Sequence, residues 1–320
     1  MNSLHVVTCV IPMYRGGEVT ASVVAALARC HLPPATELQI LIVDDGSDDG
    51  SADRVLALGL SQVRILTQSV NSGRSAARNR GAREAMTDWL LFLDSDCEPV
   101  DAGFVLAHLR AVGSGSRLSM GAVIGANDGF WHDYQASAAS RRERAAQSGG
   151  TALYGSSQNF MVSRDAFIAQ GGFDEAYRGY GFEDRDLFLR LAAAGVESVA
   201  TPDAAVIHRD QLALRTVCRK MAEAGGSSAV RFAAEHPEAY VKLGYARLDG
   251  RRSRALRFVE PLSTLSVRIL VPLFESRLEA WWLPFSIKRR LVRGLTAASF
   301  VHGSIHNGGS SFLAVRKRPS

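Results

Sequence analysis

The chain has 320 residues, of which 47% are hydrophobic and 22% are charged. These are ordinary globular proportions, so they exclude disordered, fibrous and multi-span membrane proteins, and the length allows one large domain or one domain with a substantial appendage. The net charge of +5 is unevenly distributed, because residues 211–320 hold 19 Lys+Arg against 7 Asp+Glu. That segment carries a net +12 and residues 1–210 a net −7, which predicts two regions, 1–210 and 211–320, of opposite electrostatic character.

Residues 5–101 alternate short apolar segments with segments of helical periodicity. The predicted strands are 5–11, 38–43, 63–67 and 89–93, and the predicted helices are 19–29, 52–58 and 75–86. Strands that are apolar on both faces and separated by helices form parallel sheets through right-handed crossovers. The sequence therefore predicts an α/β, doubly wound fold, in which ligands bind beyond the carboxyl ends of the strands.

Residues 102–210 are less regular. We expect strands at 120–125 and 155–162, a strand pair around Pro202 within 198–207, and helices at 104–112, 130–147, 165–170 and 182–194. Beyond residue 211 the pattern is helical. Breaks are predicted at Gly225-Gly226, Pro237, Pro261, Pro272 and Pro284, and fraying from His306 onwards.

The cysteines and the N-terminus carry little functional signal. Cys9, Cys30, Cys97 and Cys218 show no CxxC or Cys/His spacing, so we expect reduced core thiols. The first residues lack a basic segment followed by a long apolar stretch, so no secretory signal is expected. No segment reaches the roughly 20 apolar residues that a spanning helix needs.

Two acidic motifs follow predicted strands. Asp94, Ser95 and Asp96 come directly after WLLFL. Two carboxylates one residue apart can bind a hard divalent cation, and a solvated turn is the alternative. In IVDDGSDDGS, Asp45 is placed to accept a hydrogen bond from the ring of a bound ligand, and a capped strand-to-helix turn is the alternative.

Three further motifs carry charge. NSGRSAARNRG offers Arg78 to a phosphate, or forms a solvated basic helix face. FEDRDLFLRL opens a helix at Glu183 and Asp184, where a carboxylate is either a general base or a helix cap. His208, at the end of a predicted strand, is either a structural residue or a ligand to a cation.

Taken together and in this order, the motifs resemble those of the inverting glycosyltransferases of family 2, which have the GT-A fold. The matching segments are VIPMY (10–14), VDDGSDDGS (43–51), NSGRSAARNRG (71–81), FLDSD (92–96), GGFDE (171–175) and FEDRDLFLRL (182–191). One departure is Arg15, where the family usually has Asn. The resemblance covers about residues 5–210 and implies a Rossmann-like, mostly parallel sheet flanked by helices, followed by a mainly helical basic extension.

The resemblance also implies roles for individual residues. The residues implied to bind the nucleotide-sugar donor are Pro12, Tyr14, Asp45, Arg78, Asp94 and Ser95. Of these, Asp45 would accept a hydrogen bond from a ring N–H of the base, and Arg78 would lie near the phosphates.

The same resemblance implies which residues bind the metal ion and which carboxylate is the general base. Asp96 would hold Mn²⁺ or Mg²⁺, with Asp94 in or near its shell and His208 as an added ligand. Asp184 would deprotonate the acceptor hydroxyl, while Glu183 would bind acceptor or orient the site, and which of the two is the base stays open.

The predicted function is metal-dependent, inverting transfer of a sugar from a nucleotide-sugar donor, a UDP-sugar, to a hydroxyl of a glycan, polysaccharide or lipid-linked precursor. Two alternatives stay open. One is nucleotidyl transfer on a similar sheet, although the Lys-containing glycine loop after the first strand is missing. The other is a non-catalytic, sugar-nucleotide-binding protein at a membrane.

Residues 262–295 interleave apolar and aromatic residues with basic ones. This composition suits an anionic membrane surface, and packing onto the catalytic region or onto a second subunit of a homo-oligomer is equally compatible. No nucleic-acid-reading motif accompanies the basic charge, so a nucleic-acid partner is not expected. We predict a cytoplasmic protein, peripheral on the cytoplasmic face of a membrane.

Overall fold

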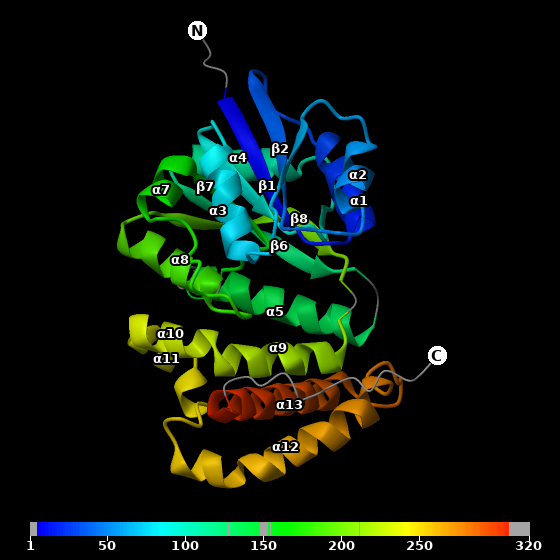
Figure 1. Cartoon of the computed structure of the whole chain (residues 1–320), viewed down its shortest axis with the longest axis vertical. Coiled ribbons are helices and arrows are strands. Elements are labelled where there is room, and N and C mark those ends of the chain that lie inside the picture. Colours follow the sequence, from blue (N-terminus) through cyan, green and yellow to red (C-terminus); the bar gives the residue numbers. More distant parts are fainter. Residues whose placement is uncertain (1–4, 127–128, 148–152, 154, 211, 307–320) are drawn as a thin grey trace. The chain divides into compact units, whose positions relative to one another are not determined.

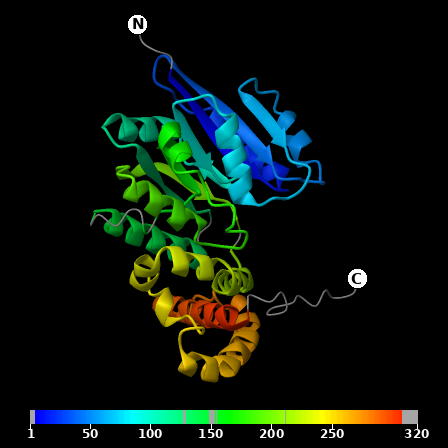
Figure 2. The same ribbon diagram turned by 60° about the vertical axis from the view of Figure 1, so that its left-hand side comes forward.

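The computed structural model describes residues 5–126, 129–147, 153, 155–210 and 212–306. The chain divides into two compact units (Figure 1 and Figure 2). The first comprises Met1–Asp128, Gln135–Glu175 and Asp184–Asp210, and the second comprises Gly129–Tyr134, Ala176–Glu183 and Gln211–Ser320. The first unit contains the strands, and the described secondary-structure elements of the second are helices.

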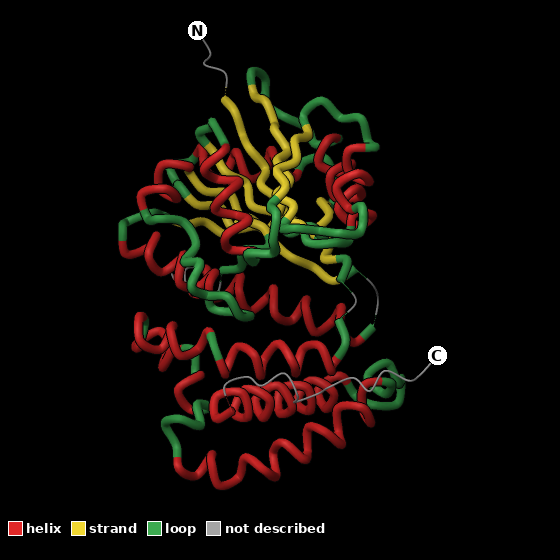
Figure 3. The backbone as a smooth tube through the Cα atoms, viewed as in Figure 1, coloured by secondary structure: helices red, strands yellow, loops and turns green. Residues whose placement is uncertain are grey.

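The first unit is built on a sheet of eight described strands in the order β3-β2-β1-β4-β7-β6-β8-β5 (Figure 3). The strands are β1 (His5–Met13), β2 (Thr36–Asp44), β3 (Val63–Thr67), β4 (Trp89–Leu93), β5 (Cys97–Pro99), β6 (Leu118–Gly125), β7 (Asn159–Ser163) and β8 (Ser198–His208). Neighbours among β3, β2, β1 and β4 are parallel, as predicted. Beyond β4 the sheet is mixed, because β7 runs antiparallel to β4 and β6, and β5 antiparallel to β8.

The sequence prediction is wrong at two strands. Residues 198–207 were expected to form a strand pair, but β8 is a single strand whose register with β6 shifts between Gly121 and Ala122. Gly121 pairs with Thr201 and Ala122 with Ala205, so β8 carries extra residues around Pro202. A bulge at this point accommodates a residue that has no N–H to donate to the ladder. The short strand β5 was not predicted.

Alternate residues of the central strands face two separate cores. In β1, Cys9 and Ile11 belong to one core and Val10 to the other. The first core is covered by α1 (Gly17–Ala28), α2 (Ser51–Leu56) and α4 (Phe104–Gly113), and the second by α3 (Arg74–Glu84), α7 (Arg164–Ala169) and α8 (Glu183–Ala193). This arrangement explains why the strands are apolar on both faces.

The long helix α5 (Phe130–Gln147) has the bounds predicted from the sequence. All four cysteines are free thiols: Cys9, Cys97 and Cys218 are buried and Cys30 is half-buried.

His108 of α4 is buried in a polar network between the helix and the sheet. Its Nδ1 lies 2.8 Å from Ser119 Oγ and its Nε2 lies 2.9 Å from Asn159 Oδ1. Ser119 Oγ is in turn 2.7 Å from Thr201 Oγ1. Burial lowers the pKa of His108 to about 4, so its imidazole stays neutral where an exposed histidine would be protonated.

This histidine predicts that the folded chain loses stability on acidification. Because the pKa of His108 falls from 6.5 to about 4 on folding, the unfolded chain binds the proton first. The stabilisation is complete above pH ~6.5 and is lost as the pH falls towards ~4, by on the order of 3 kcal/mol. Urea unfolding across this range should show the loss in the native protein and a smaller one in His108→Gln. The same pH dependence in both proteins would contradict the prediction.

The secondary-structure elements described in the second unit are helices. Those beyond residue 211 are α9 (Leu214–Gly226), α10 (Ser228–Glu235), α11 (Pro237–Lys242), the 3₁₀ helix η1 (Tyr245–Arg247), α12 (Arg254–Glu275) and α13 (Phe285–His306). Helix α13 packs against both α9 and α12 (Figure 1 and Figure 2). Gly303 permits the close approach of α13 to α9, because a Cβ at this position would lie 1.8 Å from the carbonyl oxygen of Ala222.

Three of the predicted breaks in this unit are confirmed. Gly226 ends α9, Pro237 begins α11 and Pro284 precedes α13. The breaks predicted at Pro261 and Pro272 are wrong, because α12 continues through both. Both prolines are exposed, so the backbone carbonyls that they leave without a helical partner can be hydrated. The fraying predicted from His306 onwards lies almost wholly outside the described residues.

No helix among the described residues is both long and apolar enough to cross a bilayer.

Candidate active site

The carboxyl ends of β1, β2 and β4 lie side by side, because these strands are parallel neighbours. Their register pairs Met13 with Asp44 and Val10 with Phe92. The structure therefore brings the predicted donor-binding positions that follow these strands, Tyr14, Asp45 and Asp94, to one edge of the sheet. Two of the remaining three donor-binding residues lie next to these in the chain: Pro12 is half-buried within β1, and Ser95 is half-buried after Asp94.

The carboxylate of Asp45 is buried and ties down the loop before α3. Its Oδ1 accepts hydrogen bonds from Gln68 Nε2 at 2.6 Å and from the backbone N–H of Ser72 at 2.7 Å. Its Oδ2 accepts one from the backbone N–H of Gly73 at 2.8 Å. Because each carboxylate oxygen has two lone pairs, Oδ2 retains one acceptor site beyond these hydrogen bonds.

Tyr14 and Arg15 form the exposed loop after β1. The ring of Tyr14 is half exposed, and the guanidinium carbon of Arg15 lies 5.2 Å from its centroid. Arg15 has a φ of 62°, its N–H donates to Ser47 Oγ at 2.8 Å, and its guanidinium pairs with Asp48 at 3.0 Å. The residue that departs from the family pattern therefore connects the first loop to the turn after β2.

Arg78 of α3 is buried and pairs with Asp94. The distance from Arg78 Nη2 to Asp94 Oδ1 is 2.5 Å, and the guanidinium lies 5.1 Å from the ring centroid of Phe173. The side chain of Arg78 is only 2% exposed, whereas that of Asp94 is 25% exposed. The predicted phosphate-binding arginine thus directly holds one of the predicted site carboxylates.

Removing the positive charge of Arg78 should destabilise the fold. We expect Arg78→Met to lower the free energy of unfolding by about 3 kcal/mol, because it leaves the partly buried Asp94 without its partner. The matched control is Arg83→Met on the same helix, where the arginine side chain is 61% exposed, and there we expect a change within about 0.5 kcal/mol. Urea denaturation measures both. Equal stabilities of the two variants would show that the Arg78–Asp94 pair does not support the fold.

Asn79 joins two of the sequence motifs. Its Oδ1 accepts from the N–H of Phe173 at 2.8 Å, and its Nδ2 donates to the Phe173 carbonyl at 2.8 Å and to Glu175 at 2.9 Å. Gly172, with a φ of 70°, is needed here, because a Cβ would lie 2.5 Å from Asn79 Oδ1. NSGRSAARNRG and GGFDE therefore meet and position the helix that carries Arg78.

Asp96 and His208 meet because the short strand β5 pairs with the end of β8. This antiparallel pairing sets Cys97 opposite His208, and the N–H of Arg209 donates to the Asp96 carbonyl at 2.8 Å. Asp96 Oδ2 and His208 Nε2 are 3.3 Å apart. Neighbouring ligands of an octahedral ion with bonds of about 2.1 Å lie about 3 Å apart, so the two atoms fit adjacent positions around Mn²⁺ or Mg²⁺.

Electrostatics favour an ion pair between these residues before any cation binds. Burial alone lowers the pKa of His208, but the hydrogen bond and charge of Asp96 outweigh it and raise the pKa overall. Burial alone raises the pKa of Asp96, but the hydrogen bond from His208 outweighs it and lowers the pKa overall. A cation held at this position would therefore compete with a proton for His208.

Two neighbours of this pair were not predicted as site residues. Cys97 lies within the same group of ligand-type atoms, but burial raises the pKa of its thiol well above the usual value. A protonated thiol is a poor ligand for a hard cation, so Cys97 does not fit a Mn²⁺ or Mg²⁺ site. Gln135 of α5 lies 3.3 Å from His208 Nδ1 and orients the ring. Nothing in the local sequence around Gln135 marks this role, because the contact depends on the fold.

Glu183 and Asp184 begin α8. Phe182 before them has a φ of 74°, an unusual value that turns the chain sharply into the helix. Glu183 is buried, whereas Asp184 is half-buried and so is the more accessible carboxylate. One turn further on, the ring of Phe188 packs edge-on against the ring of Phe160 of β7, with 5.2 Å between the ring centroids. This contact places α8 on the same face of the sheet as α3.

Comparison with known families identifies the family of this chain. A family model described as "Glycosyl transferase family 2" matches residues 8–171, slightly more than half of the chain. The chain belongs to glycosyl transferase family 2. A second model, "Glycosyltransferase like family 2", matches residues 139–224. The first match covers Tyr14, Asp45 and Asp96, and the second covers Asp184 and His208.

Two curated relatives are glycosyltransferases of Mycobacterium tuberculosis. The chain is 28% identical over 254 residues to N-acetylglucosaminyl-diphospho-decaprenol L-rhamnosyltransferase, and the alignment covers 68% of this chain and 78% of the relative. It is 29% identical over 238 residues to Pre-mycofactocin glycosyltransferase, which covers 72% of this chain and 48% of the relative. The relatives therefore share the enzyme class but not one substrate.

Two solved structures share the fold of this chain. The mannosyltransferase PcManGT from Pyrobaculum calidifontis, in complex with GDP-Man and Mn²⁺, superposes with a TM-score of 0.62 at 15% identity, covering 92% of this chain and 86% of that chain. S. aureus TarS 1-349 gives a TM-score of 0.51 at 14% identity, covering 95% and 92%. At these identities the likeness shows the fold alone, and it confirms the predicted GT-A architecture.

Membership of the family decides between the functions left open by the sequence. The protein is a glycosyltransferase, so nucleotidyl transfer and a purely non-catalytic role are set aside.

Proposed function

We propose that this family 2 glycosyltransferase transfers a sugar from a UDP-sugar to an acceptor hydroxyl, with inversion and with a divalent cation. The observation that carries the proposal is the 3.3 Å pair of Asp96 and His208, beyond the ends of the strands that carry Tyr14 and Asp45. Mn²⁺ or Mg²⁺ held there would offset the negative charge that develops on the departing nucleoside diphosphate.

The hydrogen-bonding capacity of Asp45 supports a pyrimidine rather than guanine as the donor base. Its Oδ2 accepts from Gly73 and retains one acceptor site, which matches the single ring N–H that uracil, like thymine, presents between two carbonyls; of these two pyrimidines we propose uracil. Guanine presents two adjacent donors and would need both carboxylate oxygens. The half-exposed ring of Tyr14 offers a surface for the base, with Pro12 and Ser95 completing the donor site.

The transfer itself needs a base for the acceptor hydroxyl. In the proposed step, Asp184 takes the hydroxyl proton while the acceptor oxygen attacks the anomeric carbon. The new C–O bond forms as the bond to the diphosphate oxygen breaks, and the nucleoside diphosphate leaves on the opposite side. A single displacement of this kind inverts the anomeric centre. Glu183, buried at the start of α8, is proposed to orient the acceptor.

The acceptor is proposed to be a hydroxyl of a lipid-linked glycan. Support comes from the relative named N-acetylglucosaminyl-diphospho-decaprenol L-rhamnosyltransferase. Residues 1–210 would form the catalytic domain, and the basic residues 211–320 would keep the enzyme peripheral to the cytoplasmic face of a membrane, near such an acceptor.

A donor screen tests the proposal. UDP-, GDP- and dTDP-sugars are incubated with the full chain, Mn²⁺ and a short-chain prenyl-diphospho-sugar acceptor, and the anomeric configuration of the product is read by NMR. We expect transfer from a UDP-sugar, inverted configuration and loss of activity with EDTA. Transfer from a GDP- or dTDP-sugar alone would overturn the assignment of the donor base. Retention of the anomeric configuration would overturn the single displacement, and full activity in EDTA would overturn the metal dependence.

A further inference from the structure

The outer face of α12 carries a continuous row of exposed apolar side chains. Between 43% and 89% of each is exposed, and they recur at spacings of three or four residues: Phe258, Leu262, Leu265, Ile269 and Leu273. This spacing puts all five on one face of the helix, and the five residues are called the α12 stripe below. Soluble proteins rarely expose contiguous apolar rows of this length without a binding role.

The stripe is not needed for the core of the second unit. The opposite face of α12 is apolar as well, and its Val267 and Val271 are buried with Val292 and Leu295 of α13. Helix α12 therefore has two apolar faces, one packed and one exposed. The sequence pattern of residues 262–295 merges these two sets, and only the structure separates them.

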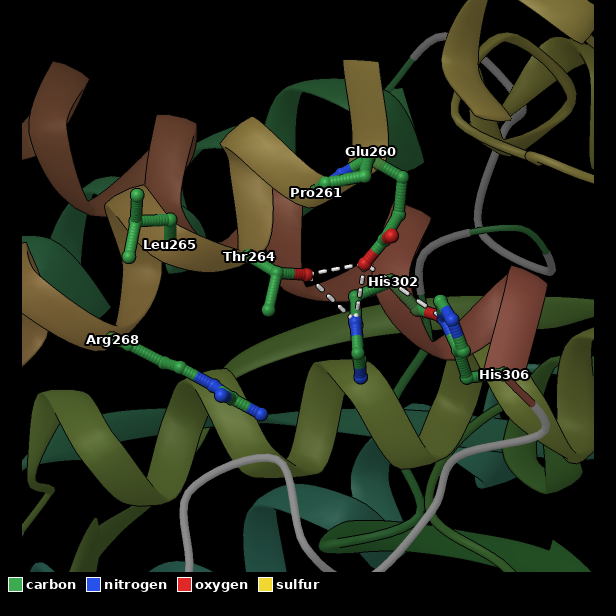
Figure 4. A pocket seen from close by; sticks show the side chains of 7 residues that line it. All are labelled: Glu260, Pro261, Thr264, Leu265, Arg268, His302 and His306. Atoms are coloured by element: carbon green, nitrogen blue, oxygen red, sulfur yellow. Dashed lines mark hydrogen bonds and ion pairs between the residues drawn. The ribbon is translucent and has the colours of Figure 1, made fainter. Parts of the chain in front are cut away.

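Polar contacts fix the rotation of α12 so that the stripe faces outwards. Glu260 of α12 is buried and lies 2.6 Å from His302 Nδ1 of α13, and Thr264 hydrogen-bonds to both groups (Figure 4). Rotating α12 about its axis would break these bonds and leave a buried carboxylate without partners. The network thus holds the inner face of α12 on α13.

Two tryptophans extend the apolar surface beyond the helix. Trp281 and Trp282, in the turn between α12 and α13, are 93% and 59% exposed. Indole rings of this kind favour the boundary between headgroups and acyl chains, because they combine an apolar ring with an N–H donor.

Basic residues flank the stripe. Arg254, Arg257 and Arg268 are exposed on α12, and Arg268 also lines a pocket of about 700 Å³ beside the stripe (Figure 4). The two carboxylates of α12 offer no counter-charge, because Glu260 is buried and Glu275 pairs with Arg215 at 3.6 Å. The exposed face of this helix is therefore apolar and cationic.

This combination selects between the candidate occupants. If two copies paired through the α12 stripe, symmetry would bring the arginines of both copies together without carboxylates on the helix to compensate them. An anionic bilayer instead offers acyl chains to the stripe and phosphates to the arginines.

We propose that the α12 stripe and the Trp281–Trp282 turn dock the enzyme on an anionic membrane surface. The stripe enters the headgroup and acyl boundary, α12 lies in the plane of the membrane, and Arg254 and Arg268 contact lipid phosphates. The inference deepens the membrane association in the proposed function, but it requires neither the donor nor the transfer chemistry assigned there.

Vesicle flotation of the full chain tests the proposal. We expect binding to phosphatidylcholine vesicles that contain phosphatidylglycerol and much weaker binding to phosphatidylcholine alone. A Leu262→Glu/Ile269→Glu variant should bind anionic vesicles at least about tenfold more weakly, because it lacks two leucine-sized side chains that become buried in the membrane on binding. An Arg254→Gln/Arg268→Gln variant should lose about tenfold on anionic vesicles only.

The matched control is Val241→Glu in α11, an exposed apolar position outside the stripe, which should bind like the native chain. Circular dichroism melting confirms that each variant is folded. Unchanged binding by the Leu262→Glu/Ile269→Glu variant, or no binding by the native chain, would overturn the proposal. The proposal would also be overturned if light scattering showed that the native chain is a dimer and that the Leu262→Glu/Ile269→Glu variant is a monomer. That result would assign the stripe to contact with a second copy. Because no sugar donor is present, the result is independent of the donor screen.

Discussion

An Asp96→Asn variant is expected to lose at least about a thousandfold in the rate of sugar transfer while it keeps its fold. The amide is neutral, so it does not attract the cation, and the contact of 3.3 Å between the Asp96 carboxylate and His208 Nε2 is lost. A bound cation supplies several kcal/mol of stabilisation to developing charge, and each 1.4 kcal/mol is tenfold in rate. Release of nucleoside diphosphate measures the rate, and the electron paramagnetic resonance signal of free Mn²⁺ measures metal binding.

The control for this experiment is Asp203→Asn, an exposed carboxylate on β8, which should keep both the native rate and the native Mn²⁺ affinity. His208→Gln should weaken Mn²⁺ binding at least about tenfold, because it removes the second ligand. Native Mn²⁺ affinity in Asp96→Asn would refute the metal centre. Loss of Mn²⁺ binding without loss of rate would show that the cation is not needed for transfer.

The second large effect is expected at Asp184. In Asp184→Asn the carboxylate that receives the hydroxyl proton is replaced by a group that cannot accept it, so kcat should fall by about 10²- to 10⁴-fold. The donor is bound by other residues, so its Kd, measured by calorimetry with Mn²⁺, should stay unchanged. A fall in kcat at constant donor affinity separates a catalytic role from a structural one.

Asp165→Asn is a matched control, because Asp165 is an exposed carboxylate in the first turn of another helix, α7. Its kinetics should equal those of the native enzyme. Glu183→Gln decides which acidic residue is the base. If Asp184→Asn retains its kcat and Glu183→Gln loses it, the assignment passes to Glu183, and if neither changes, the base lies elsewhere.

Local pattern predicted most of the first unit. The bounds of β3 and α5 agree with the sequence prediction, because strand and helix periods differ and each segment is long enough to show its own period. The prediction failed where pairing between distant segments decides the structure. The three residues of β5 are too few to show a period, and they form a strand only because β8 lies beside them.

The candidate site divides in the same way. The motifs placed Asp45, Asp94 and Asp96 at strand ends, and the parallel order of the strands places those ends at one edge. The environment of Arg78 was not predictable, since burial against Asp94 and Phe173 depends on the packing of α3 on the sheet. The contact of Gln135 with His208 likewise joins two distant segments.

The sequence by itself determined the α/β class, the family and the split between an acidic and a basic region, because composition, periodicity and ordered motifs are local properties of the chain. Only the tertiary structure decided that α12 runs through Pro261 and Pro272 and that its apolar residues divide between α13 and solvent. The reason is physical. An apolar side chain is more stable away from water, which can be read from the sequence, but only the tertiary packing determines whether the protein itself buries that side chain.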